Sequence, residues 1–243
     1  MANKSEVNTA VTGHFLDSSK LNEIQEWRPV ITGLTTNPVI LQKDGVVDIP
    51  AHLRQICQTV GPRFPVSVEI PDTRMSQEEM LELAHAYAQQ FPANAVIKVP
   101  ITDRGLKVIY QLAKEGIPIN ATLGITFSQL ALAADAGADF VSLFWGRALE
   151  SKEKYNEGPG PEVILESTLT YLLTRGHTDV RVIVGSIRTP DQVRQAIAQG
   201  AHIVTVTPEV LQASMQAKRL AETIEQFNRA YHEAKQDPNF KLV

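Results

Sequence analysis

The chain has 243 residues, which is enough for one large domain and short for two ordinary domains with a linker. Its 23 basic and 27 acidic residues give a formal net charge of −4, so its overall charge does not point to nucleic acid or an anionic membrane as a partner. The single cysteine, Cys57, excludes an intramolecular disulfide and favours a reducing compartment.

The amino-terminal stretch, residues 1–13, contains no apolar run of the signal-peptide kind. No stretch reaches the length of about 18 apolar residues that a membrane span needs. We therefore expect a cytoplasmic protein without a membrane partner.

Eight short runs of β-branched or apolar residues recur along the chain and are predicted as strands. Several are apolar at successive positions, which is typical of strands covered on both faces. The runs are residues 14–17, 30–34, 65–70, 95–99, 118–122, 139–143, 180–184 and 202–206.

Longer amphipathic segments separate these runs and are predicted as helices. Residues 76–91 form one such helix, and Ser76 with Glu79 gives the S-x-x-E pattern of a capping box at its start. Three further helices each end before a glycine, where a left-handed residue commonly stops a helix. They are residues 126–136, 161–175 and 189–199, followed by Gly137, Gly176 and Gly200.

The uninterrupted alternation of strand and helix predicts an α/β fold, a closed (β/α)8 TIM barrel over residues 1–243 as one domain. An open, doubly wound sheet is the alternative, since it shares this alternation. Residues 217–236 predict an additional C-terminal helix, which covers the barrel or reaches a neighbouring subunit. The only long loop predicted is residues 151–161, which are charged and rich in Gly and Pro.

Catalytic groups of a barrel lie where its strands end and the following loops begin. Lys98 lies within the apolar strand A-V-I-K-V, where a lysine is rarely buried without a reason. Burial disfavours the charged form of an amine, and a neutral amine can attack a carbonyl to form an imine. The alternative is a lysine that extends to water or pairs with a carboxylate.

Two carboxylates fall at neighbouring strand ends. Asp17 ends the first strand and Glu69 lies near the end of the third, so both could transfer protons beside a lysine. The alternative for Asp17 is the N-cap of the next helix, which for this residue alone is favoured. The alternative for Glu69 is a buried ion pair, with Lys98 as one possible partner.

Three polar residues follow or end other strands. Asn37 follows the second strand in T-T-N-P, and either shapes the turn or directs its amide at a substrate hydroxyl. Thr122 ends the fifth strand, with Asn120 two residues earlier on the same face. Either of these two could instead be an ordinary buried polar group bonded to backbone.

The sixth and seventh strands are followed by V-S-L-F-W-G-R and V-G-S-I-R. Arginines in two neighbouring loops, each near a glycine, suit a phosphate group through forked hydrogen bonds and close backbone approach. The alternative is two ordinary surface arginines. The candidate residues here are Ser142, Phe144, Arg147, Ser186 and Arg188.

None of the six histidines has a metal-ligand spacing such as HExxH. The sequence also lacks a G-x-G-x-x-G after a strand and a G-x-x-x-x-G-K-[ST] motif. We therefore expect no metal and no nucleotide cofactor.

Taken together, these segments resemble the transaldolase family, including its smaller branch similar to fructose-6-phosphate aldolase. The resemblance runs from about Phe15 to Leu211 and has matching pieces on every strand. Its most specific pieces, in chain order, are F-L-D-S-S, T-T-N-P, V-I-K-V-P, N-A-T, S-L-F-W-G-R and G-S-I-R.

The resemblance implies a catalytic role for four residues. Lys98 matches the lysine that forms the Schiff base, on the fourth strand as in the family. Asp17 matches the acid–base residue that handles the proton of the hydroxyl at the cleaved bond. Glu69 and Thr122 match the pair that holds a catalytic water during imine formation and hydrolysis.

The resemblance also implies substrate-binding roles. Asn37 and Ser142 match groups that hold the three-carbon dihydroxyacetone unit, and Asn120 matches a further position of the site. The phosphate clamp of the family corresponds to Arg147, Ser186 and Arg188.

Two positions bear on the reaction. Glu69 and Phe144 resemble transaldolases, whereas the aldolase-like branch tends to have Gln and Tyr there. A tyrosine hydroxyl beside the catalytic water could help discharge the enamine by protonation, which Phe144 cannot do. Trp145 is bulkier than the family leads us to expect and could narrow the acceptor side.

These observations favour transfer of a dihydroxyacetone unit between sugar phosphates, of the pentose phosphate pathway type. The alternatives are an aldolase of the same mechanism and a non-catalytic sugar-phosphate-binding barrel. The short members of the family commonly form rings of five or ten subunits, so a homo-oligomer is implied.

Overall fold

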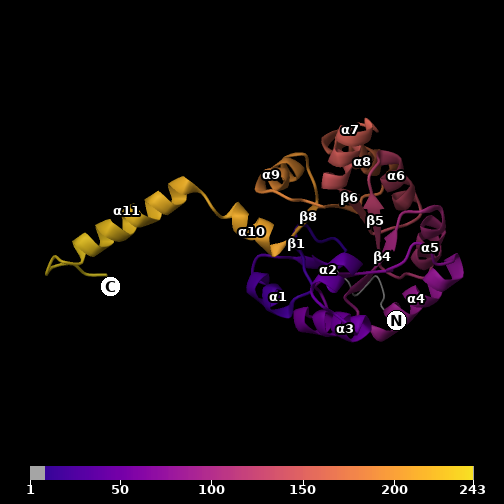
Figure 1. The fold of residues 1–243 in the computed structure, drawn as a ribbon, viewed down its shortest axis with the longest axis horizontal. Coiled ribbons are helices and arrows are strands. Elements are labelled where there is room, and N and C mark those ends of the chain that lie inside the picture. Colours follow the sequence, from indigo (N-terminus) through magenta and orange to yellow (C-terminus); the bar gives the residue numbers. More distant parts are fainter. Residues whose placement is uncertain (1–8, 243) are drawn as a thin grey trace.

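The fold, which a computed structural model describes for residues 9–242, is a closed barrel of eight parallel strands (Figure 1). Each strand pairs with its neighbours in the chain, and β1 pairs with β8 to close the barrel. This closure confirms the predicted (β/α)8 barrel over an open sheet. The strands are β1 Gly13–Asp17, β2 Gly33–Thr35, β3 Val66–Glu69, β4 Ala95–Pro100, β5 Ile119–Gly124, β6 Phe140–Phe144, β7 Arg181–Gly185 and β8 Ile203–Val206.

Helices surround the barrel, and short polar side chains begin several of them. The capping box predicted at Ser76 and Glu79 is present, and Thr102, Thr126 and Thr189 also cap helices through their hydroxyls. The three glycines predicted to end helices all have positive φ. The helices are α1 Leu21–Trp27, α2 Pro38–Lys43, α3 Ile49–Val60, α4 Gln77–Gln90, α5 Asp103–Lys114, α6 Phe127–Asp135, α7 Trp145–Tyr155, α8 Pro161–Arg175, α9 Pro190–Ala198, α10 Pro208–Ser214 and α11 Lys218–Ala234.

Two sequence predictions were wrong in their boundaries. β2 begins at Gly33, because Val30, which was assigned to the strand from the apolar run, is 59% exposed in the preceding turn. The loop predicted at residues 151–161 is shorter, because α7 continues to Tyr155 and ends at Asn156 in the left-handed conformation. Lys152 and Lys154 in the last turn of α7 suit the negative end of the helix dipole.

An apolar plug fills the part of the barrel interior near the amino ends of the strands. It consists of Val11, Phe15, Val96, Phe140, Ile183 and Ile203. The rings of Phe15 and Phe140 lie 6.4 Å apart between centroids. Gly33 makes room for this packing, since a Cβ there would lie 2.3 Å from the Phe15 ring. A larger apolar layer packs between strands and helices, so polar side chains are left to the carboxyl ends of the strands.

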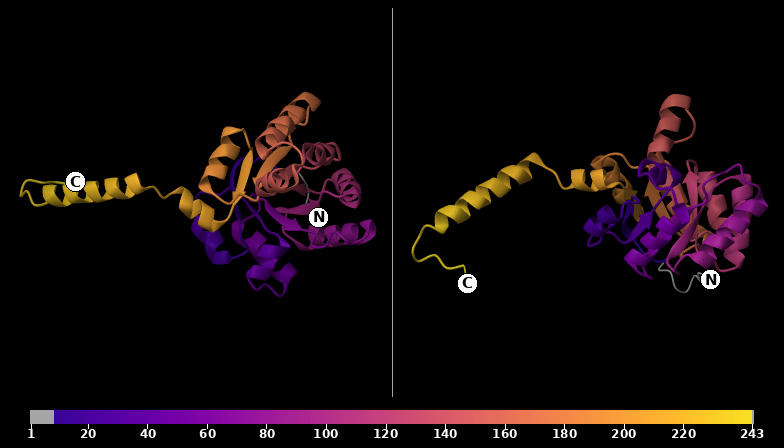
Figure 2. Two further views of the ribbon diagram at one scale, coloured as in Figure 1. Left: turned by 45° about the horizontal axis from the view of Figure 1, so that its top comes forward. Right: turned by 60° about the horizontal axis from the view of Figure 1, so that its bottom comes forward.

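The predicted C-terminal helix is present as α11, but it does not cover the barrel. α11 extends away from the barrel in every ribbon view (Figures 1 and 2), and none of its described residues is buried. Its apolar side chains recur every three or four residues, which places them on one face. They are Leu220, Ile224, Phe227 and Tyr231, and we call them the α11 stripe.

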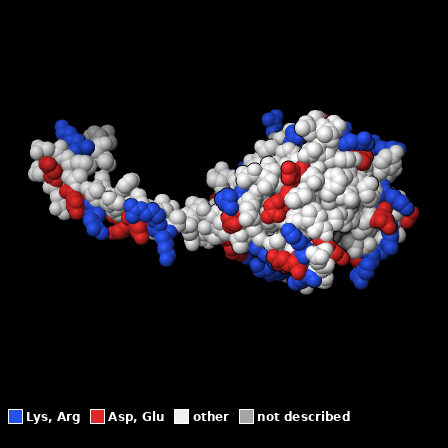
Figure 3. All heavy atoms as spheres, turned by 90° about the horizontal axis from the view of Figure 1, so that it is seen from above, with Lys and Arg blue, Asp and Glu red and all other residues white. Residues whose placement is uncertain are grey.

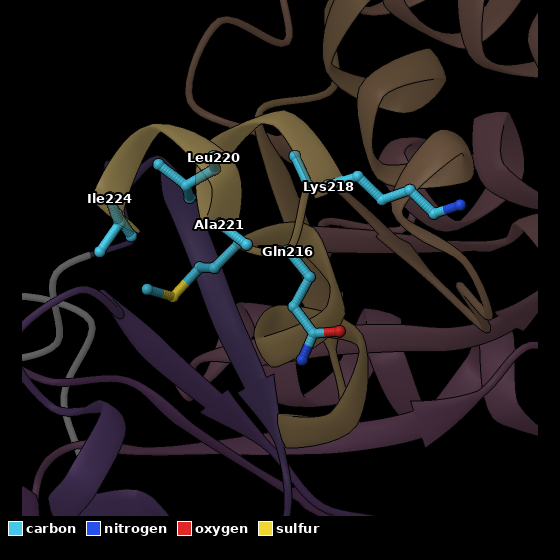
Figure 4. A pocket seen from close by; sticks show the side chains of 7 residues that line it. Gln216, Lys218, Leu220, Ala221 and Ile224 are labelled. Carbon is cyan, nitrogen blue, oxygen red and sulfur yellow. The ribbon is translucent and has the colours of Figure 1, made fainter. Parts of the chain in front are cut away.

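A shallow pocket marks the junction of α10 and α11 (Figure 4). It has a volume of about 550 Å³, and its wall includes Met215, Leu220 and Ile224. Figure 3 shows acidic and basic side chains interspersed on one face of the barrel and along α11. Within residues 9–242, no helix has the length and apolar character that crossing a membrane requires.

Candidate active site

A cavity of about 690 Å³ lies among the carboxyl ends of the strands, and every strand contributes to its wall. Of the eleven candidate site residues predicted from the sequence, eight line this cavity: Asp17, Asn37, Glu69, Lys98, Ser142, Phe144, Arg147 and Ser186. The other three, Asn120, Thr122 and Arg188, lie outside the set of lining residues. The barrel therefore brings together side chains that are far apart in the sequence.

Lys98 and Glu69 form a buried ion pair in the wall of this cavity. They occupy paired register positions on β3 and β4, and the Lys98 Nζ lies 2.8 Å from a Glu69 carboxylate oxygen. The same Nζ donates a hydrogen bond of 3.1 Å to the carbonyl of Thr36. Lys98 is only 3% exposed, so the alternative of a lysine extending to bulk water is wrong. The ion pair with Glu69, which was the other alternative, is observed, and it lies in the cavity wall.

Asp17 ends β1 and lines the cavity, where its side chain accepts a 2.8 Å hydrogen bond from Thr35 Oγ1. That hydroxyl also lies 2.5 Å from the hydroxyl of Thr205. The helix-cap alternative for Asp17 is wrong, because α1 begins at Leu21 with Lys20 as its N-cap.

Burial raises the pKa of Asp17, and the negative charge of Glu69 adds to the rise. The positive charge of Lys98 and the hydrogen bond from Thr35 oppose it without reversing it. A carboxyl group with a raised pKa takes and returns a proton nearer neutral pH, which is what acid–base catalysis requires.

A chain of hydrogen bonds runs behind the cavity wall through Ser67, Asn120 and Ser142. The Asn120 amide donates to the Ser67 hydroxyl at 3.0 Å, and the Ser142 hydroxyl donates to the Asn120 carbonyl oxygen at 2.7 Å. Asn120 is fully buried, whereas Ser142 lines the cavity. Asn120 therefore positions the Ser142 hydroxyl from behind.

Thr122 is fully buried at the end of β5, and its hydroxyl has no hydrogen-bond partner among the described residues. A buried polar group of this kind calls for a water or ligand as partner. The next residue, Leu123, has a φ of +66° at a register irregularity between β5 and β6, and it lines the cavity. A non-glycine residue in this region of φ is strained, and such strain is common at functional sites.

Asn37 shapes the turn, and it also lies at the cavity. Its side-chain oxygen accepts a 3.0 Å hydrogen bond from the Ile40 N–H and so caps α2. The same side chain lines the cavity. Asn37 therefore shapes the turn and also faces the site.

The segments after β6 and β7 meet at the side of the cavity. The Gly146 N–H donates to the Ser186 carbonyl at 3.1 Å, and Ser186 has a φ of +56°. Arg147 was expected in a loop, but it lies in the first turn of α7, because that helix starts directly after β6. Arg147 and Arg188 both form ion pairs with Glu150, at 2.9 Å and 2.6 Å.

The sequence suggested that Trp145 could narrow the acceptor side of the site, but its side chain does not reach the cavity. Its side chain is only 1% exposed and belongs to the apolar layer between strands and helices. Its neighbour Phe144 lines the cavity instead. The chain turns from β6 into α7 between these two residues, which separates their environments.

A model of the family described as Transaldolase/Fructose-6-phosphate aldolase matches residues 14–241. The chain belongs to this family. The assignment confirms the resemblance inferred from the ordered motifs along the strands.

Curated relatives within the family cover most of the chain. A probable transaldolase of Dehalococcoides mccartyi is 36% identical over 204 residues, which is 83% of this chain and 89% of the relative. A probable transaldolase of Thermoanaerobacter sp. is 36% identical over 224 residues, covering 90% and 97%. One of Thermus thermophilus is 37% identical over 203 residues, covering 79% and 85%.

Sequence reasoning missed several residues of this transaldolase-family site. Thr35 and Thr205 position Asp17, and Ser67 supports Asn120. The signal was their place in the strands, since Ser67 lies two residues before Glu69 and therefore on the same face. Within residues 9–242, no group of three or more His, Cys, Asp or Glu side chains is placed to hold a metal ion.

Proposed function

We propose that this transaldolase-family enzyme moves a dihydroxyacetone unit between sugar phosphates through a Schiff base on Lys98. The observation that carries the proposal is the buried Lys98 amine in the cavity wall, 2.8 Å from the Glu69 carboxylate. Family membership and relatives named probable transaldolases support the reaction class.

The proposed reaction begins when the Lys98 amine, after giving a proton to a neighbouring base, attacks the ketone carbon of the donor sugar. Loss of water gives an iminium ion. Asp17 then accepts the proton of the hydroxyl next to the breaking carbon–carbon bond, and the bonding electrons move to the iminium nitrogen to leave an enamine. The aldehyde departs, an acceptor aldehyde enters, and the same steps run in reverse. The imine supplies the electron withdrawal that a Lewis acid would otherwise provide.

Glu69 and Thr122 are proposed to hold the water that forms and hydrolyses the imine. The supporting observation is the buried Thr122 hydroxyl without a protein partner among residues 9–242. Because a hydroxyl and a carboxylate offer both donor and acceptor sites, they suit a water that must be oriented and deprotonated.

Substrate binding is proposed to divide between two sides of the cavity. Asn37 and Ser142 would hold the hydroxyl groups of the three-carbon unit, with Asn120 positioning Ser142. Arg147, Ser186 and Arg188 would hold the phosphate, because arginines bind phosphate oxygens through charge-assisted hydrogen bonds.

Transfer is favoured over hydrolytic release because Phe144 lines the cavity without a hydroxyl that could protonate the enamine. A coupled assay with fructose 6-phosphate, run with and without erythrose 4-phosphate, tests this. Turnover that depends on the acceptor supports a transaldolase. Equal glyceraldehyde 3-phosphate release without acceptor would instead identify an aldolase of the same mechanism, and the absence of any turnover would favour a sugar-phosphate-binding barrel.

We further propose that the protein is a cytoplasmic homo-oligomer acting in carbohydrate metabolism of the pentose phosphate type. The α11 stripe supports the assembly, since it leaves apolar side chains uncovered on a helix that extends from the barrel. A pentamer or decamer is the expected size. Analytical ultracentrifugation of the full chain and of Phe227→Glu tests this: the variant should dissociate, and a monomeric full chain would contradict the assembly.

A further inference from the structure

Glu150 lies on α7 between the two arginines that are proposed to bind phosphate. One of its carboxylate oxygens accepts a hydrogen bond from Arg147 at 2.9 Å, and the other lies 2.6 Å from an Arg188 guanidinium nitrogen. Each oxygen is therefore held by an arginine from a different segment, α7 or the loop after β7. Two oxygens of a phosphate group would use the two guanidinium groups in the same way.

The two arginines keep the Glu150 side chain negatively charged at neutral pH. The hydrogen bond from Arg188, followed by that from Arg147, lowers the pKa of Glu150. The side chains of Arg147 and Arg188 are 59% and 50% exposed. Ion pairs this exposed are weak, so a ligand with a higher negative charge can compete for the same arginines.

The backbone packs closely where α7 meets the loop after β7. A Cβ at Gly146 would lie 2.5 Å from the Ser186 carbonyl oxygen and 3.3 Å from the Arg188 Nε. The start of α7, Ser186 and Arg188 are thus packed closely together. Arg147 and Ser186 line the cavity that contains Lys98, so this arrangement lies at the edge of the proposed active site.

We infer that Glu150 is an internal anion, which occupies the arginine pair until a phosphorylated substrate displaces it. The inference rests on the proposed function, because that function assigns the two arginines to phosphate. Glu150 would keep the guanidinium groups paired in the free enzyme and would weaken phosphate binding. A substrate without phosphate would leave Glu150 in place and gain nothing from either arginine.

Direct binding of inorganic phosphate tests this without relying on turnover. Isothermal titration calorimetry would compare the wild type with Glu150→Gln, which removes the charge and keeps the shape of the side chain. The matched control is Glu153→Gln, an exposed carboxylate on the same helix. We expect phosphate to bind Glu150→Gln threefold to tenfold more tightly, which corresponds to about 0.7–1.4 kcal/mol, and Glu153→Gln within twofold of wild type.

The other outcomes separate the inference from the function on which it rests. Equal or weaker phosphate binding by Glu150→Gln would overturn the inference, and Glu150 would then only connect α7 to the loop after β7. An equal gain in Glu153→Gln would also overturn it, because a general charge effect would then be sufficient. Phosphate binding by neither the wild type nor the variants would overturn the arginine clamp itself. If Glu150→Gln does not fold by circular dichroism, Glu150→Ala replaces it in the same comparison.

Discussion

The Lys98 ammonium and the Glu69 carboxylate lie 2.8 Å apart at paired positions of adjacent strands, and both side chains are largely withdrawn from water. Removing one partner of such a pair leaves a charge buried without compensation, whereas replacing both partners removes the problem. We expect Lys98→Met and Glu69→Leu each to lower the free energy of unfolding by about 3 kcal/mol. The Lys98→Met/Glu69→Leu double variant should lose less than the sum of the single losses.

Urea unfolding of the wild type and the three variants measures this coupling. The double-mutant cycle isolates the pair if each substitution introduces no new contact. Strictly additive losses would contradict the account, because the two charges would then contribute independently.

The raised pKa of Asp17 means that this residue lowers the stability of the fold at neutral pH. Burial disfavours the carboxylate in the folded state, so the charged form costs stability above the folded pKa. That cost disappears as the pH falls below the ordinary carboxyl value. Asp17→Asn should therefore be more stable than wild type by about 1 kcal/mol at pH 7.5, with the difference shrinking toward pH 3.5.

Thermal unfolding across this pH range tests the Asp17 prediction. Asp179→Asn is the control for the substitution itself, since Asp179 is exposed. A stabilisation by Asp17→Asn that grows as the pH falls would contradict the assigned cause.

Phe140 is one of the two large aromatic side chains in the apolar plug. It is 1% exposed and its ring packs near that of Phe15. Phe140→Ala should lower the free energy of unfolding by about 3–5 kcal/mol, because the substitution leaves a void inside the closed barrel. Denaturant unfolding measures the loss, and Tyr155→Ala at an exposed position serves as control. Equal losses for the two variants would show that packing in the plug contributes no more to the free energy of unfolding than an exposed side chain does.

Phe144 is expected to set the balance between transfer and cleavage. Phe144→Tyr places a hydroxyl in the cavity, where it can help protonate the enamine and release dihydroxyacetone. The ratio of acceptor-independent cleavage to transfer should rise several-fold in the coupled assay. Phe227→Tyr adds the same hydroxyl far along α11 and should leave the ratio at the wild-type value. An unchanged ratio in Phe144→Tyr would show that residue 144 does not set the balance between transfer and cleavage.

The strands and most of the residues that line the cavity could be predicted because buried parallel strands leave strong local signals. The apolar run around Lys98 identified both β4 and the unusual lysine, and the Ser76–Glu79 pattern located the start of α4. The family motifs then assigned roles to residues on separate strands. Eight of the eleven candidates line one cavity because a closed barrel directs its strand ends to one place.

Other features depend on three-dimensional context that sequence alone does not carry. Trp145 adjoins Phe144 in the chain yet faces the apolar layer, because the backbone turns into α7 between them. Glu150 lay in a stretch without a motif, and only the meeting of α7 with the loop after β7 reveals its two arginine contacts. The charged composition after residue 150 suggested a loop, although the local geometry is helical as far as Tyr155.

Covalent trapping tests the central claim most directly. The protein is incubated with fructose 6-phosphate, reduced with borohydride and digested, and the modified peptide is located by mass spectrometry. We predict one adduct on Lys98 in the wild type and in Lys107→Ala, an exposed-lysine control, and none in Lys98→Met, which should also lose essentially all turnover. An adduct on another lysine, or turnover that persists in Lys98→Met, would contradict the account.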